Sequence, residues 1–140
     1  SEGGLAWQRR LVMIDVMRAA ITDPAARQLP NTLAGRYGYT SAGAARANGI
    51  CADILAMLAA RLETQAGRGS EYFVGDEFTA ADLYWACFSQ LVAPMAEDLN
   101  PMPKRLRGPY TAPETLFIDP ILLEHRSKMY ERYLSLPLEF

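Results

Sequence analysis

The chain has 140 residues, of which 50% are hydrophobic and 21% are charged, and its formal net charge is -2. This length and composition are typical of one globular domain and exclude an intrinsically disordered chain. The small net charge argues against nucleic acid or an anionic membrane as a partner, and no apolar run approaches the ~20 residues of a membrane-spanning helix. Two cysteines and the lack of a signal-peptide pattern lead us to expect a cytoplasmic protein.

The first part of the chain predicts two long helices with a short irregular segment between them. Apolar residues recur three and four positions apart over residues 5–21, which is the spacing of one helical face. Asp23 followed by Pro24 predicts the start of a short helix, and residues 30–38 are expected to form a loop or a bent continuation. Thr40 or Ser41 can cap a second long helix that ends near residue 65. Its expected buried stripe consists of Ile50, Ile54, Leu58 and Leu62.

The second part predicts two more long helices. Residues 80–96 are apolar nearly all round, so we expect this helix to be central and buried. Four prolines in residues 100–115 allow at most a turn or two of helix there. Asp119 and Pro120 then start a last helix to about residue 134, and residues 136–140 form an apolar tail that should pack on the domain. The fold class is therefore all-α, with four long helices and one or two short ones in a single domain over residues 1–140.

The start of the helix at residue 80 carries the clearest local signal. Thr79 is placed as the N-cap, where its hydroxyl can accept a hydrogen bond from the amide of Asp82. The Asp82 carboxylate can accept from the Thr79 amide in return, which makes a capping box. Phe78 and Leu83 flank the cap at the positions of a hydrophobic staple.

This capping box and staple, preceded by the run Tyr72-Phe73-Val74-Gly75, resembles the capping element of the C-terminal helical domain of the glutathione transferase superfamily. The resemblance is specific over roughly residues 44–95. It implies a glutathione transferase C-terminal-like helical bundle, in which the box starts a helix that runs through the core. The alternative is an unrelated ligand-binding bundle in which the cap is a coincidence.

No nucleophile paired with a base is visible in the sequence, and we interpret Asp82 as a structural capping residue rather than a catalytic one. Cys51 and Cys87 lie in apolar helical patterns, so both are expected to be buried thiols. His125 is the only histidine, which excludes a metal site built from several histidines. We therefore assign no catalytic residue, no metal and no cofactor to this chain.

The resemblance explains why this chemistry is missing. In glutathione transferases an N-terminal thioredoxin-like domain binds glutathione and activates its sulfur. The first helix begins almost at once here, so the chain looks like the second half of such a protein. Glutathione is then the co-substrate only if the thioredoxin-like domain is present in the full-length protein.

The helical half of these proteins contributes to the pocket for a hydrophobic co-substrate and to the dimer interface. By resemblance, the candidate substrate-binding residues are Met13, Met17, Tyr37 and Tyr39. Methionine is polarizable and adaptable, which suits a permissive pocket, although methionine at helical spacing is also common in cores. A tyrosine hydroxyl could orient a substrate.

Two functions remain open at this point. The first is the co-substrate-pocket and dimerisation domain of a glutathione transferase-like protein, inactive on its own. The second is a non-catalytic protein-interaction module with the same helical fold. We expect a homodimer or other self-association, because the apolar residues of the first helix cannot all face one core. The arginine-rich, alanine-rich composition suggests a bacterial source.

Overall fold

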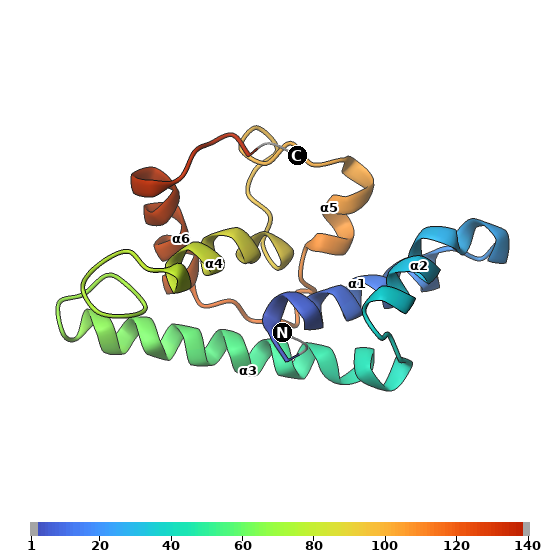
Figure 1. Ribbon diagram of the computed structural model, residues 1–140, viewed down its shortest axis with the longest axis horizontal. Coiled ribbons are helices and arrows are strands. Elements are labelled where there is room, and N and C mark those ends of the chain that lie inside the picture. Colours follow the sequence, from blue (N-terminus) through green and yellow to red (C-terminus); the bar gives the residue numbers. More distant parts are fainter. Residues whose placement is uncertain (1–2, 139–140) are drawn as a thin grey trace. The chain divides into compact units, whose positions relative to one another are not determined.

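The computed structural model describes residues 3–138, and these residues form six α-helices and two short 3-10 helices without a strand (Figure 1). The predicted all-α fold class is confirmed. The chain divides into two compact units, the first ending at Cys51 and the second beginning at Ala52. The expectation of a single domain over the whole chain stays a prediction.

Two of the helices of the first unit, those that follow Asp23 and Thr40, begin at the side-chain caps that the sequence predicts. The elements are α1 (Leu5–Ala20), the 3-10 helix η1 (Pro24–Arg27), α2 (Gln28–Arg36) and the beginning of α3 (Ser41–Ala66). The Asp23 carboxylate accepts from the amide of Ala25 at 2.9 Å and so caps η1, as predicted. Residues 30–36 belong to α2, which follows η1 directly, so of the two expected alternatives the helical continuation forms and the loop does not. Pro30 is compatible with this helix because it lies in the first turn, where an amide hydrogen has no partner within the helix.

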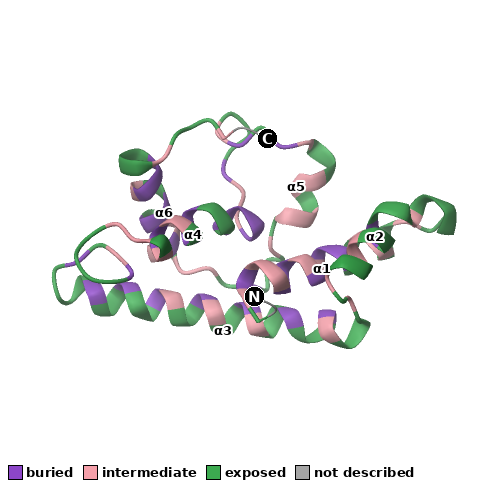
Figure 2. Cartoon of the chain, viewed as in Figure 1, coloured by how far each residue is buried: buried purple, intermediate pink, exposed green. Residues whose placement is uncertain are grey.

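The buried side of α3 includes Leu62 as predicted, but before Leu62 it lies one residue position further along the chain than the predicted stripe. Thr40 caps the helix, since its Oγ1 accepts from the Gly43 amide at 3.0 Å. Ile50 and Ile54 are only half-buried, and Figure 2 shows buried and exposed residues alternating along the whole helix. The buried positions are Ala44, Ala47, Cys51, Leu55, Ala59, Leu62 and Gln65. Small side chains form much of this stripe because they let a neighbouring element approach closely, as Leu11 of α1 does on Ala44 and Ala47.

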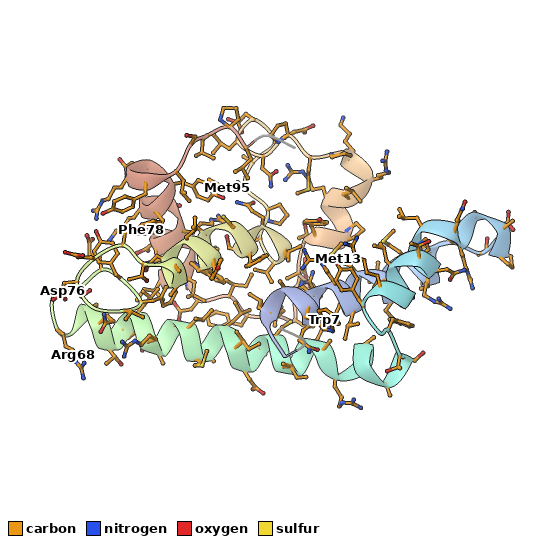
Figure 3. All side chains as sticks on the ribbon, in the orientation of Figure 1. Trp7, Met13, Arg68, Asp76, Phe78 and Met95 are labelled. Atoms are coloured by element: carbon orange, nitrogen blue, oxygen red, sulfur yellow. The ribbon has the colours of Figure 1, made fainter. Side chains whose placement is uncertain are left out.

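The second unit packs α4 against α6 around an apolar cluster. Its helical elements after α3 are α4 (Ala80–Phe88), the 3-10 helix η2 (Ser89–Leu91), α5 (Lys104–Tyr110) and α6 (Pro120–Tyr133). The centre of the cluster consists of Ala86, Met95, Met129 and Tyr130, and Figure 3 shows where Met95 and Phe78 lie on the ribbon. Phe78, Leu99 and Leu138 are among the half-buried residues that pack around it.

Helix α4 ends eight residues earlier than predicted, at Phe88 instead of residue 96. Pro94 has no amide hydrogen to donate and disfavours the helical conformation of the residue before it. The Met95 amide donates instead to the side-chain Oε1 of Gln90 at 2.9 Å. The apolar pattern continues through residue 96 because η2 and the segment that follows are also buried, so the pattern overstated the length of the helix.

The predicted burial of α4 is also wrong on one face. Asp82, Trp85 and Ala86 are buried, whereas Tyr84 is 61% exposed and Phe88 is 39% exposed. Cys87, which lies between Tyr84 and Phe88 in the sequence, was predicted to be buried but is also exposed. Apolar residues surround α4, but α6 covers only part of its surface.

The last third of the chain follows the sequence predictions closely. Helix α5 has seven residues, in line with the one or two turns expected. The Asp119 carboxylate accepts from the Ile121 amide at 3.0 Å and caps α6. The tail packs on the unit through Leu138, whose amide donates to the carbonyl of Leu99 at 2.8 Å. The last two residues of the predicted tail, 139 and 140, lie outside the described residues. Among the described helices, none has the length and hydrophobicity needed to span a bilayer.

Candidate functional site

Asp82 is the centre of the hydrogen bonds that begin α4. The Thr79 amide donates to Asp82 Oδ2 at 2.8 Å, and the Thr79 hydroxyl donates to the same oxygen at 2.7 Å. The Thr79 side chain also faces the Asp82 amide, so both halves of a capping box are in place. Phe78 stacks on Tyr133 of α6, with 4.4 Å between the ring centroids. A staple contact between Phe78 and Leu83 stays a prediction.

Asp82 also joins α4 to α6 through His125. Its Oδ1 lies 2.9 Å from Nε2 of His125, and the same oxygen accepts from the Phe73 amide at 2.9 Å. Asp82 is fully buried, and His125 is 4% exposed. The imidazole also packs against the Phe73 ring, at 4.6 Å between centroids. The carboxylate therefore connects three segments that are distant in the sequence.

Opposing effects decide the charges of this pair. Burial alone would raise the pKa of Asp82, but the hydrogen bonds from Phe73, Thr79 and His125 outweigh it and hold the pKa below its ordinary value. Burial lowers the pKa of His125, and the attraction of Asp82 does not compensate fully. At neutral pH Asp82 is thus ionised and His125 is neutral. Because a carboxylate only accepts hydrogen bonds, the single imidazole proton is on Nε2.

An imidazole oriented by a carboxylate is the arrangement of a general base, but this pair lacks a nucleophile. Nδ1 of His125 is buried, and no described residue forms a hydrogen bond with it. No serine, threonine or cysteine of the described chain is therefore positioned for activation by His125. A second link between the same helices, from Trp85 Nε1 to the Leu122 carbonyl at 2.8 Å, indicates that the pair holds α4 and α6 together.

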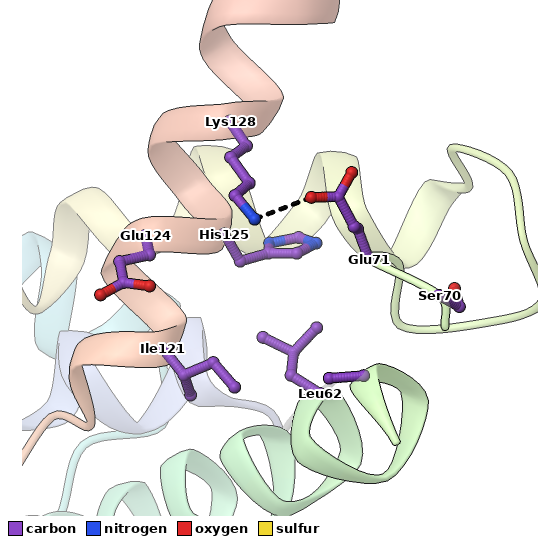
Figure 4. A pocket seen from close by; sticks show the side chains of 8 residues that line it. Leu62, Ser70, Glu71, Ile121, Glu124, His125 and Lys128 are labelled. Carbon is purple, nitrogen blue, oxygen red and sulfur yellow. Dashed lines mark hydrogen bonds and ion pairs between the residues drawn. The ribbon is translucent and has the colours of Figure 1, made fainter. Parts of the chain in front are cut away.

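A cavity of about 240 Å³ lies beside His125 (Figure 4). Its lining residues are Leu62, Ala66, Ser70, Glu71, Ile121, Glu124, His125 and Lys128. Glu71 accepts from Lys128 at 2.8 Å and from Arg132 at 2.7 Å. The hydrogen bonds from Arg132 and Lys128 lower the pKa of Glu71 to about 2.

The two tyrosines of the predicted substrate site both contact α1. The Tyr39 hydroxyl donates to Asp15 Oδ1 at 2.5 Å, and the Arg18 guanidinium lies over the Tyr39 ring at 5.3 Å. The Tyr37 ring meets Trp7 edge-on at 5.2 Å. Arg10 lies over Tyr37 at 5.4 Å. Each tyrosine is half-buried and is held by α1 in a defined position.

The two methionines of the predicted substrate site differ in exposure. Met13, labelled in Figure 3, is 7% exposed and belongs to the buried side of α1, whereas Met17 is half-buried. In the first unit Tyr37 and Tyr39 therefore pack beside α1, which itself carries Met17, and each of these three side chains is partly exposed. Met13 is buried. Binding of a substrate by any of the four residues stays a prediction.

The sequence predictions did not include the pairing of His125 with Asp82. A signal was present, because Leu122, His125 and Met129 recur at helical spacing on α6 and a histidine on such a face needs a buried partner. Among the described residues no group of three or more histidine, cysteine or acidic side chains is placed to hold a metal ion. Cys51 is buried, as predicted.

A family model described as the glutathione S-transferase C-terminal domain matches residues 41–112. This range covers just over half of the chain and includes α3, the capping element and α4. Neither a curated protein nor a solved structure matches the chain.

Proposed function

The chain belongs to the glutathione S-transferase C-terminal domain family, and we propose that it is the helical half of a glutathione transferase-like protein. In this role it lines the pocket for a hydrophobic co-substrate and contributes to a dimer interface. It is not catalytic by itself. A thioredoxin-like domain of the full-length protein binds glutathione and supplies the residue that activates the thiol.

The packing of Tyr37 and Tyr39 against α1 carries the part of the proposal that concerns the co-substrate. Asp15 holds the Tyr39 hydroxyl, and Trp7 with Arg10 fixes the Tyr37 ring. Rings held in this way lose little conformational freedom when a ligand binds, which favours affinity. The half-buried Met17 adds a polarizable surface, while Met13 is buried.

The exposed face of α4 supports the part of the proposal that concerns a partner. Tyr84 and Phe88 are large, apolar and substantially exposed on one helix, and exposed apolar patches mark sites of protein–protein contact. We assign this face to the thioredoxin-like domain. In the isolated chain the same face would drive self-association.

The experiment measures co-substrate binding and assembly separately on the isolated chain. In an NMR titration with a chlorodinitrobenzene, we expect saturable shifts at Met17, Tyr37 and Tyr39. Tyr39→Phe, which removes only the hydroxyl, should weaken binding several-fold. Shifts elsewhere, or none, would contradict the co-substrate role and favour the alternative, a non-catalytic protein-interaction module.

Sedimentation of the same chain tests the exposed face of α4. The double variant Tyr84→Ser and Phe88→Ser should reduce self-association. A matched control is Phe117→Ser, which removes a side chain that is 73% exposed but lies outside α4. A wild-type chain that is monomeric at high micromolar concentration would contradict the assignment of this face.

A further inference from the structure

We propose that the cavity beside His125 binds a small organic cation with an apolar body. The cavity belongs to the second unit and includes none of the residues of the co-substrate proposal, so the two proposals stand or fall separately. Its volume of about 240 Å³ is below the ~300–1,000 Å³ of pockets that hold drug-sized ligands. A ligand with a single ring matches this size.

The apolar part of the cavity comes from two helices. Leu62 and Ala66 lie on the last turns of α3, and Ile121 lies on the first turn of α6. Figure 4 shows the Leu62 and Ile121 side chains on the same side of the cavity, below the imidazole. This surface can cover the face of a ring and remove it from water.

The charged part of the cavity favours a positive ligand. Glu71 and Glu124 line it, against Lys128 as the only lining residue with a positive charge. Lys128 is already engaged by Glu71 at 2.8 Å. Glu124 forms no ion pair with another described residue, so its carboxylate is available to an incoming ammonium group. A carboxylate ligand would instead meet the Glu124 carboxylate, while the one lining cation, Lys128, is already paired with Glu71.

The His125 imidazole lines the same cavity. Asp82 accepts a hydrogen bond from Nε2 and fixes the orientation of the ring, which leaves Nδ1 with a lone pair, buried and with no hydrogen-bond partner among the described residues. A buried acceptor without a partner is rare in folded proteins. The polar group that a ligand in the cavity can reach is therefore the exposed Glu124 carboxylate, an acceptor that is the complement of an ammonium group.

The test uses three ligands that share one ring: benzylamine, benzyl alcohol and benzoate. In NMR titrations of the full chain, benzylamine should give saturable shifts at Leu62, Ile121 and Lys128. Benzyl alcohol should bind more weakly, and benzoate at least about tenfold more weakly than benzylamine, because the ligand charge reverses. Equal affinities for benzylamine and benzoate, or shifts that lie outside the cavity, would overturn the proposal.

A pair of matched variants assigns the selectivity to the cavity. Glu124→Gln removes the available carboxylate at an exposed position, so the fold should be retained and benzylamine affinity should fall about tenfold. Glu114→Gln removes the same charge from an exposed residue that does not line the cavity, and it should leave the affinity unchanged. An equal effect of both variants would mean that the overall charge, and not this cavity, attracts the cation.

Discussion

Replacing Asp82 with alanine should destabilise the fold by about 5 kcal/mol, through the loss of a helix cap and of two buried hydrogen bonds. Loss of the cap costs about 1 kcal/mol. The Phe73 amide and His125 Nε2, each 2.9 Å from Asp82 Oδ1, would lose their acceptor in a buried place. Each donor left without a partner costs about 2 kcal/mol, near the middle of the usual range. The total is a large part of the stability of a typical domain.

Urea denaturation followed by circular dichroism measures this loss. With a denaturant dependence of about 2 kcal/mol per molar urea, 5 kcal/mol lowers the midpoint by about 2.5 M. Thr79→Ala keeps the buried pair and should cost only about 1 kcal/mol, which preserves a measurable transition if the Asp82 variant does not fold. Asp98→Ala, at an exposed position, is the control and should stay within about 0.5 kcal/mol of wild type. An Asp82→Ala variant within 1 kcal/mol of this control would refute the reasoning.

Four further predictions concern titration, thiol reactivity and activity. Because the pKa of His125 in the fold is below its ordinary 6.5, the unfolded chain takes up that proton first, so stability should be full above pH 6.5 and decline below it. A second loss of stability should begin below pH 3.8, where Asp82 becomes protonated. The variant His125→Phe should remove only the loss of stability that comes from His125. Urea midpoints measured across acid pH test both losses. A thiol reagent should modify exposed Cys87 in the native chain and buried Cys51 only after unfolding, and equal rates would contradict this difference. Carboxyl NMR should place the pKa of Glu71 at about 2, whereas a midpoint at its ordinary 4.5 would show that its ion pairs do not form in solution. The isolated chain should not conjugate glutathione to an aromatic electrophile, and saturable turnover by purified material would contradict a purely helical, non-catalytic half.

The starts of η1, α3, α4 and α6 could be predicted from the sequence because they depend on residues only a few positions apart. An N-cap side chain bonds an amide two or three residues further on, so the pairs Asp23-Pro24 and Asp119-Pro120 carry the whole signal. The same holds for Thr79 and Asp82, whose reciprocal bonds span three residues. Pro94 signalled locally that the helix could not continue to residue 96, but the apolar pattern concealed this signal, and α4 itself ends six residues before Pro94, at Phe88.

The buried faces and the pairing of distant side chains were decided by tertiary structure. Cys87 and Phe88 have the hydrophobicity of core residues, yet they are exposed because α6 covers only one side of α4. His125 could be recognised as a histidine on an apolar face, but its partner Asp82 is 43 residues away. Hydrophobic periodicity specifies that a helix has a buried side, and helix packing selects that side when several are apolar. The capping role of Asp82 was therefore readable from its neighbours, while its second role as the partner of His125 arises only when α4 and α6 come together.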